Sequence, residues 1–174
     1  MLREIHKGRV VDLRVETVVL PNGRTTDLEL IAHKGAAAVA AVDADGQVIL
    51  IRQYRYAARG FLWELPAGVL DTPDEPPERC AARELREEAG VTAGEITRLG
   101  TVLPSPGFSE ERIHLFLARD LGHVGHDHEA DEVITEIRRV PVREALAMIR
   151  RGDVVDGKTI AGLYLAAAAL GVVS

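Results

Sequence analysis

Residues 77–90, PERCAARELREEAG, decide the fold, because they predict a helix with acidic side chains along one stripe. Proline in the first turn and glycine directly after the last helical residue are common start and stop signals. At about 100° of rotation per residue, Glu84, Glu87 and Glu88 fall within an arc of roughly 100°. Converging carboxylates are suited to binding Mg²⁺ or Mn²⁺. The alternative is an exposed face with ordinary charge pairing between Arg83 and Glu87.

Upstream of this helix, residues 64–68, ELPAG, predict a strand end that runs into a glycine turn and brings backbone carbonyls beside the carboxylates. Alternation and β-branched residues predict strands over 10–20, 25–31, 36–42, 47–54, 61–65, 96–103, 113–118 and 133–140. The segments 36–42 and 47–54 are expected to pair through the turn at 43–46. Helices are also expected over 142–151 and 159–170.

These elements predict an α/β fold in which helices cover both faces of a mixed sheet. Residues 1–34 are expected to form an N-terminal antiparallel β ribbon with a turn at Pro21-Asn22-Gly23, and 35–174 the main domain. A length of 174 residues with 47% apolar and 28% charged residues is typical of one globular domain after such a ribbon.

Charge and cysteine content restrict the class of protein. A net charge of −6 argues against a nucleic-acid partner, although local carboxylates can still recruit cations that bind phosphates. The single cysteine, Cys80, cannot form a disulfide within the chain and is expected to be a packed thiol. With neither a signal-like N-terminus nor an apolar run of ~18 residues, we expect a cytoplasmic protein without a membrane partner.

Gly68, Glu75 and the segment 83–91, RELREEAGV, together resemble the Nudix box. That pattern is Gly, five residues, Glu, seven residues, then Arg-Glu-apolar-any-Glu-Glu-any-Gly-apolar. Here six residues separate Gly68 from Glu75, which leaves the role of Glu75 open. The extra residue falls in a loop, where an insertion costs little. The resemblance covers roughly residues 35–170 and implies the Nudix α/β/α sandwich with a mixed sheet.

Three further features resemble the ADP-ribose pyrophosphatase branch of this family. Pro106 follows Val91 by fifteen residues, it begins the segment 106–111, PGFSEE, and residues 52–56 are RQYRY. A plain Pro-Gly turn is the alternative explanation of the second feature. The resemblance implies hydrolysis of the diphosphate bond of ADP-ribose to AMP and ribose 5-phosphate, with Mg²⁺ as cofactor and Mn²⁺ as a second possibility.

The resemblance also implies which residues form the metal site. Glu84 and Glu88 are expected to be the principal ligands, together with the carbonyl oxygen of Ala67. Glu87 is expected to be either a ligand or a group that orients one. Arg83 is expected to fix these carboxylates, and we count Arg83 and Glu87 among the catalytic residues.

The catalytic base is expected in the acidic segment 126–132, HDHEADE, because the branch places its base in a loop well after the box. Glu129 is the preferred candidate. Asp131 and Glu132 compete with it, and a solvated acidic loop without a catalytic role is the remaining alternative.

Substrate contacts are expected from Arg52 and Arg55, whose guanidinium groups can bind diphosphate oxygens, and from Glu111 in the branch-specific loop. Structural ion pairing is the alternative for both arginines. Because members of the branch form homodimers by exchanging N-terminal strands, Arg24 is expected to reach the substrate of a neighbouring subunit.

Two other functions remain open from the sequence. One is a hydrolase of other nucleoside diphosphate sugars, which would use the same metal chemistry. The other is a non-catalytic module that senses ligands related to ADP-ribose. Such modules often lose the metal carboxylates, whereas Glu84, Glu87 and Glu88 are all present here, so catalysis is favoured.

Overall fold

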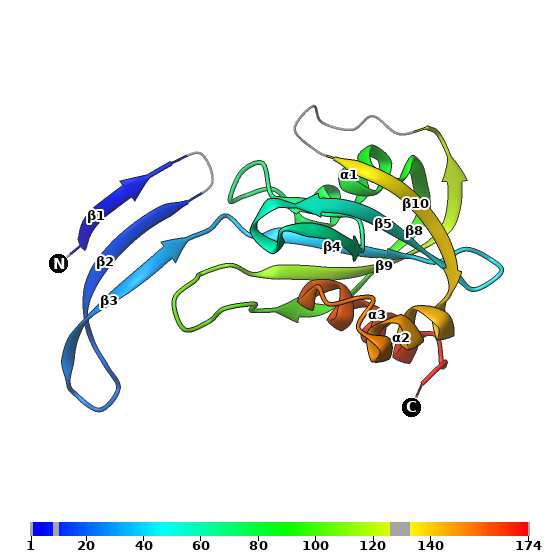
Figure 1. Ribbon diagram of the computed structural model, residues 1–174. Helices are drawn as coiled ribbons and strands as arrows, with labels where there is room; N and C mark the ends of the chain where they lie inside the picture. Colours follow the sequence, from blue (N-terminus) through cyan, green and yellow to red (C-terminus); the bar gives the residue numbers. More distant parts are fainter. Residues whose placement is uncertain (1, 9–10, 126–132, 174) are drawn as a thin grey trace.

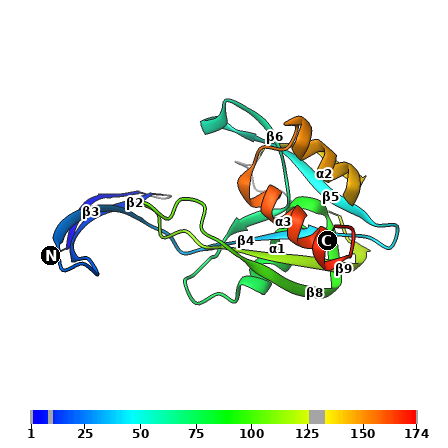
Figure 2. The ribbon, with the colours of Figure 1, turned by 90° about the horizontal axis from the view of Figure 1, so that it is seen from below.

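The computed structural model describes residues 2–8, 11–125 and 133–173. The first of its sheets contains the N-terminal strands, which extend away from the rest of the molecule in both views (Figures 1 and 2). They pair antiparallel in the order β1-β2-β3, with bounds β1 (Leu2–Lys7), β2 (Asp12–Val19) and β3 (Thr25–Ala32). The predicted ribbon over β2 and β3 is therefore confirmed, and β1 adds a third strand that the sequence did not predict.

Two further sheets form the body of the molecule. One has the order β7-β4-β9-β8 and is mixed, because β4 pairs antiparallel with β7 and parallel with β9. Its strands are β4 (Ala36–Ala41), β7 (Ala67–Val69), β8 (Val91–Val102) and β9 (Ile113–His123). The other has the order β10-β5-β6, with β5 (Gln47–Arg55), β6 (Gly60–Glu64) and β10 (Ile134–Pro141), and a 3-10 turn, η1 (Tyr56–Ala58), joins β5 to β6.

The expected pairing of 36–42 with 47–54 is wrong. Only an isolated bridge between Val42 and Val48 joins the two segments, and β4 and β5 belong to different sheets. The reason is burial, since all six residues of β4 are buried and the strand needs a neighbour on each side and a cover on each face. The turn at 43–46 therefore redirects the chain from one sheet to the other.

Alternate residues of β4 pack into separate cores on its two faces. Ala37, Val39 and Ala41 share a buried cluster with Leu85 of α1 (Pro77–Ala89). Ala40 shares another with residues of α2 (Val142–Arg151) and α3 (Gly157–Ala169). Figure 1 shows α1 on one side of the strands and α2 and α3 on the other, which confirms helices on both faces.

Helix α1 has the bounds that the sequence predicted. Pro77 occupies its first turn, and Gly90 ends it in the left-handed conformation, with φ 67° and a backbone N–H bonded to the carbonyl of Arg86. Helix α3 begins two residues earlier than expected, because the carboxylate of Asp156 caps it by accepting from the Thr159 N–H at 3.0 Å. None of the helices in the described ranges has the length and apolarity to span a membrane.

Candidate active site

A pocket of about 650 Å³ lies where α1, β5, β7 and the start of α3 meet. Its lining brings together several of the expected site residues, namely Arg55, Ala67, Gly68, Arg83, Glu84 and Glu111. The volume lies within the range of roughly 300–1,000 Å³ that is usual for small-molecule sites. The lining is rich in charged side chains, and these also include Lys34, Asp71, Asp156 and Lys158.

The close approach of β7 to α1 depends on Gly68. A Cβ atom at this position would lie 2.0 Å from Oε1 and 2.2 Å from Cδ of Glu84, closer than any real contact. Only glycine therefore lets the Glu84 carboxylate lie against the strand, where it is 7% exposed. The sequence predicted a glycine turn at this point that brings backbone beside the carboxylate helix. The structure forms this arrangement with the short strand β7 instead of a turn.

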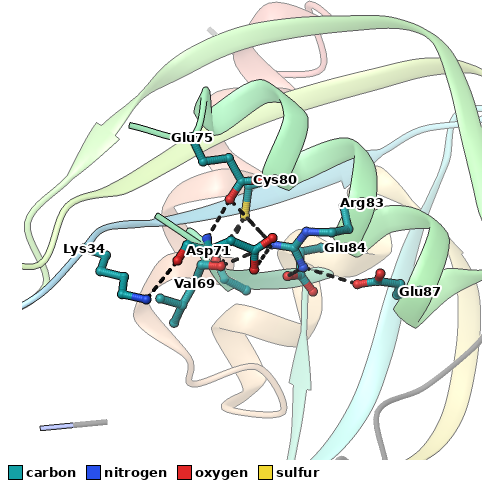
Figure 3. A network of polar contacts seen from close by, with 9 residues as sticks. Lys34, Val69, Asp71, Glu75, Cys80, Arg83, Glu84 and Glu87 are labelled. Atoms are coloured by element: carbon teal, nitrogen blue, oxygen red, sulfur yellow. Dashed lines mark hydrogen bonds and ion pairs between the residues drawn. The ribbon is translucent and has the colours of Figure 1, made fainter. Parts of the chain in front are cut away.

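Arg83 is the hub of the polar contacts at this helix, as Figure 3 shows. Its Nη1 donates to Glu84 Oε1 at 2.5 Å and to Glu87 Oε2 at 3.2 Å, and its Nη2 donates to the Val69 carbonyl at 3.2 Å. Burial opposes the charged form, but the surrounding acidic groups, Glu84 foremost, together outweigh it and raise the pKa of Arg83. Arg83 thus fixes two of the expected metal carboxylates relative to β7.

The other carboxylate on this face, Glu88, is fully buried. Its Oε2 accepts from the backbone N–H of Ala67 at 2.7 Å, so the side chain is anchored to the strand that also carries the Ala67 carbonyl. A buried carboxylate is costly unless it is bonded or paired. Glu84 and Glu88 therefore meet β7 at two successive residues, Gly68 and Ala67.

These groups fit a hard divalent cation by their chemistry. Oxygen donors come from the Glu84 and Glu88 carboxylates and from the backbone of Ala67, which Glu88 contacts. Arg83 donates to both Glu84 and Glu87, so the Glu87 carboxylate lies beside the same group. Within the described ranges, no three His, Cys, Asp or Glu side chains already form a closed cluster that could hold a metal. Arg83 donates to Glu84 and Glu87, and the Ala67 N–H donates to Glu88, so each carboxylate has a defined position.

Glu75, whose role the sequence left open, and Cys80, which was expected to be a packed thiol, both support the loop beside the pocket. Glu75 Oε2 accepts from the Asp71 N–H at 2.7 Å and lies 3.8 Å from Arg83 Nη2. Cys80 is fully buried, with its Sγ 3.5 Å from the Gly68 carbonyl. Burial and the nearby Glu84 charge raise the pKa of its thiol to about 12, which confirms a packed thiol.

Arg55 combines both alternatives that the sequence left open. It lines the pocket, and it also forms a two-bond ion pair with Glu64, Nε to Oε1 and Nη2 to Oε2, each at 2.8 Å. The hydrogen bonds to Glu64 raise the pKa of Arg55.

Arg52 lies three positions before Arg55 on β5, so its side chain faces the opposite side of the strand. Its guanidinium lies over the Phe61 ring, 5.2 Å from the ring centroid, and Arg52 is not part of the pocket lining.

The other expected site residues lie farther apart. Glu111 lines the pocket, and its Oε1 is 3.8 Å from Nε2 of His33. Arg24 is exposed at the turn between β2 and β3, in the sheet that extends away from the body. Glu129, with its competitors Asp131 and Glu132, lies outside the described residues.

Sequence reasoning missed the contribution of α3 and of the end of β6. Glu64, Asp156 and Lys158 form one network beside Arg55, and Lys34 Nζ donates to the Asp71 carbonyl at 2.9 Å on another side of the pocket. One signal was present, since Asp156 precedes an apolar run, as an N-cap residue does. That signal locates a helix start but does not reveal the strand it meets.

Comparisons with known proteins agree with this geometry. A model of the NUDIX domain matches residues 32–163. The chain is 40% identical to an ADP-ribose pyrophosphatase of Bacillus subtilis over 157 residues, 90% of this chain and 84% of that protein. It is 39% identical to an ADP-ribose pyrophosphatase of Mycobacterium tuberculosis over 163 residues, 91% and 77% of the two chains. A crystal structure of an ADP compounds hydrolase shares the fold with a TM-score of 0.83 at 22% identity, covering 98% and 92%.

Proposed function

Because the chain belongs to the NUDIX family, we propose that it hydrolyses the diphosphate bond of ADP-ribose and releases AMP and ribose 5-phosphate. The observation that carries this proposal is the likeness to two bacterial ADP-ribose pyrophosphatases across most of the chain. The pocket supports it, because Arg55 lines the same space as Glu84 and Ala67, two of the groups proposed to recruit a cation. A neutral or purely apolar pocket would not suit a diphosphate.

The proposed cofactor is Mg²⁺, with Mn²⁺ as an alternative, held by Glu84, Glu88 and the Ala67 carbonyl, and by Glu87 directly or through its neighbours. When bound, such an ion neutralises the diphosphate and lowers the pKa of a water molecule. Arg83 keeps Glu84 and Glu87 in place for this purpose, because it donates to both carboxylates. The Ala67 N–H does the same for Glu88.

Binding of the diphosphate is assigned to Arg55, which lies in the pocket with 40% of its side chain exposed. Glu111 is a candidate for contacts to the ribose hydroxyls, since a carboxylate accepts hydrogen bonds from them. Glu129 remains our candidate for the base that accepts the proton of the attacking water, with Asp131 and Glu132 as alternatives. Arg24 is a candidate for a substrate contact across a dimer, because it lies on the N-terminal sheet and outside the pocket lining of its own chain. Arg52 is kept as a second candidate for the diphosphate, with its contact to the Phe61 ring as the structural alternative.

We further propose a homodimer in which residues 1–34 pack on the other subunit, while 35–174 form the catalytic domain. The N-terminal sheet supports this, since β1 is exposed along its length and Leu2, Val19 and Leu28 present apolar side chains to the surface. A thin ribbon is only marginally stable unless it packs against something. A cytoplasmic location is included in the proposal, in keeping with the single buried thiol.

The substrate is tested by product identification with Mg²⁺ across ADP-ribose, GDP-mannose and UDP-glucose. We expect AMP and ribose 5-phosphate from ADP-ribose at the highest kcat/KM. Intact ADP-ribose together with rapid cleavage of one of the sugar nucleotides would assign the enzyme to that substrate instead. Binding of ADP-ribose without cleavage of any of the three, in the presence of Mg²⁺ or Mn²⁺, would favour the sensor.

The dimer is tested by light scattering at micromolar concentration, with activity followed on dilution. A monomer with unchanged specific activity would exclude the exchanged ribbon and the role of Arg24.

A further inference from the structure

Glu64, at the end of β6, is a carboxylate that the proposed chemistry does not use and that is almost inaccessible, with 1% of its side chain exposed. Two cations hold it, since Arg55 donates two hydrogen bonds and Lys158 Nζ donates a third to Oε2. Burial opposes its ionisation, but the bonds from Arg55 and the charge of Lys158 outweigh it and lower the pKa of Glu64. The carboxylate therefore stays ionised and bonded to both cations near neutral pH.

Lys158 is itself held in place from the other side. Its Nζ also donates to Asp156 Oδ2 at 3.0 Å, and its side chain is only 14% exposed. The same Asp156 oxygen accepts from the backbone N–H of Thr159 at 3.0 Å and from its hydroxyl at 2.6 Å. Lys158 therefore connects Glu64 to the capped first turn of α3, which is a rigid element.

Helix α3 is in turn locked to β6. The Thr159 hydroxyl accepts from the Leu65 N–H at 2.9 Å, and both groups are buried. Gly162, one turn further along, lies so close that a Cβ atom there would be 2.6 Å from Leu65 Cδ1. The start of α3 thus has a fixed position relative to Glu64 and Leu65, and through Lys158 it also determines where the Glu64 carboxylate lies.

The position of Glu64 determines in turn how Arg55 presents its charge. The two bonds to Glu64 occupy Nε and Nη2, and no bond from Nη1 is found within the described part of the chain. A guanidinium held along one edge keeps the direction of its remaining donors, which reduces the side-chain entropy lost on binding an anion. Without Lys158, the negative charge of Glu64 would be balanced by Arg55 alone, so less positive potential would remain for a diphosphate.

We propose that Lys158 is a positioning residue, which acts through Glu64 to hold the Arg55 guanidinium in the orientation that binds the diphosphate. This inference rests on the proposed function for the identity of the ligand. Lys158 lines the same pocket, so direct contact between its ammonium and the substrate is the alternative that an experiment must separate from positioning.

Three variants address this role. Lys158→Met removes the charge and keeps most of the length, and Lys158→Arg retains a cation that can reach both carboxylates. Arg151→Met is the matched control, because Arg151 also binds two carboxylates, Glu144 at 2.8 Å and Asp153 at 3.0 Å, outside the pocket lining. Should Lys158→Met not fold, Lys158→Gln takes its place. Its neutral amide can still donate to Glu64 but carries no charge, so KM and the spectrum of Arg55 should change in the same direction by a smaller amount.

Steady-state kinetics with ADP-ribose and Mg²⁺ give the first readout. We expect Lys158→Met to raise KM about tenfold with little change in kcat, as loss of ground-state binding does. Lys158→Arg should restore most of the affinity, and Arg151→Met should match the wild type. The double variant Arg55→Ala/Lys158→Met should have the KM of Arg55→Ala alone, because a residue that acts through Arg55 has no effect once Arg55 is removed.

The second readout needs no substrate. In the ligand-free protein, the ¹⁵Nε–¹Hε cross-peak of Arg55, assigned by its loss in Arg55→Lys, reports the bond to Glu64. We expect it to shift or broaden in Lys158→Met and to remain in Arg151→Met. An unchanged cross-peak overturns the proposal, even with a raised KM, and so does additivity in the double variant. If the wild type leaves ADP-ribose intact, the proposed function fails, while this cross-peak still decides the role of Lys158.

Discussion

Replacement of Gly68 by alanine should separate the metal site from the stability of the fold. The added Cβ would lie 2.0 Å from Glu84 Oε1, whereas ordinary van der Waals contact begins at 3.4 Å, so the carboxylate must move by about 1.4 Å. The backbone at Gly68 is that of a short strand paired with β4, which alanine can adopt. Glu84 sits on a flexible side chain, so it should give way more readily than β7.

The displacement has a small effect on folding and a large one on catalysis. Glu84 would lose its 2.5 Å bond to Arg83. Charge-assisted bonds of this kind contribute about 1.5–3 kcal/mol, and part of this is recovered when the carboxylate turns to water. We therefore expect the free energy of unfolding to fall by about 1–2 kcal/mol. Substitution of residues that only support metal ligands typically lowers metal affinity or activity about 10- to 100-fold. Displacement of a proposed ligand should therefore lower kcat/KM by at least about 100-fold.

The assay compares Gly68→Ala with Gly60→Ala, whose new Cβ would meet only the Ala58 carbonyl, at 3.8 Å, within 4 Å among the described residues. Thermal unfolding, Mn²⁺ binding followed by electron paramagnetic resonance, and ADP-ribose turnover are measured on both. Gly60→Ala should behave as the wild type. If Gly68→Ala binds Mn²⁺ normally and retains turnover within a factor of three, Glu84 is not confined by β7 in the way the geometry requires.

Two substitutions and one labelling experiment test separate parts of the site. Glu88→Gln keeps an acceptor for the bond from the Ala67 N–H but loses the charge. Mn²⁺ affinity should therefore fall sharply and turnover should nearly disappear, and normal Mn²⁺ binding would exclude Glu88 as a ligand. Glu129→Gln should retain Mn²⁺ binding and lower kcat by about 10²–10⁴-fold, whereas a mild effect there with loss in Glu132→Gln or Asp131→Asn would move the base. With a pKa of about 12, the Cys80 thiol is almost entirely protonated at pH 8. Mass spectrometry should therefore find Cys80 unmodified by iodoacetamide until the protein unfolds, and rapid alkylation of the native protein would contradict its burial.

The parts of the fold that follow from local signals could be predicted. Helix α1 has its start, its end and its carboxylate stripe within fourteen consecutive residues, so its bounds were correct. The pairing of β2 with β3 also follows locally, from two alternating segments and a Pro-Asn-Gly turn. Strand β1 gave no comparable signal, because all six of its residues are exposed and they show no apolar face.

The pairing of β4 could not be read in the same way. A short apolar segment followed by a turn and another apolar segment is typical of a hairpin, but it is equally typical of two buried strands in different sheets. Six consecutive buried residues show that β4 is central, and its parallel partner β9 begins more than seventy residues later. A strand order of this kind is fixed by how the helices cover both faces, which no local pattern reveals.

The residues of the site form two groups: those that contact each other along one helix, and those that are distant in the sequence and meet only in the folded protein. Arg83, Glu84 and Glu87 lie within one turn and a half of α1, so their contacts follow from spacing alone. Lys158 and Glu64 are separated by 94 positions, and no period connects them. Yet the arginine expected to bind the diphosphate is held by Glu64, and Glu64 is held by Lys158. A buried carboxylate with one cation from its own sheet and a second from a distant helix ties the orientation of a binding group to the packing of that helix. Substitutions that loosen α3 against Leu65 should therefore weaken substrate binding before they affect the metal carboxylates, which are anchored on α1 and β7.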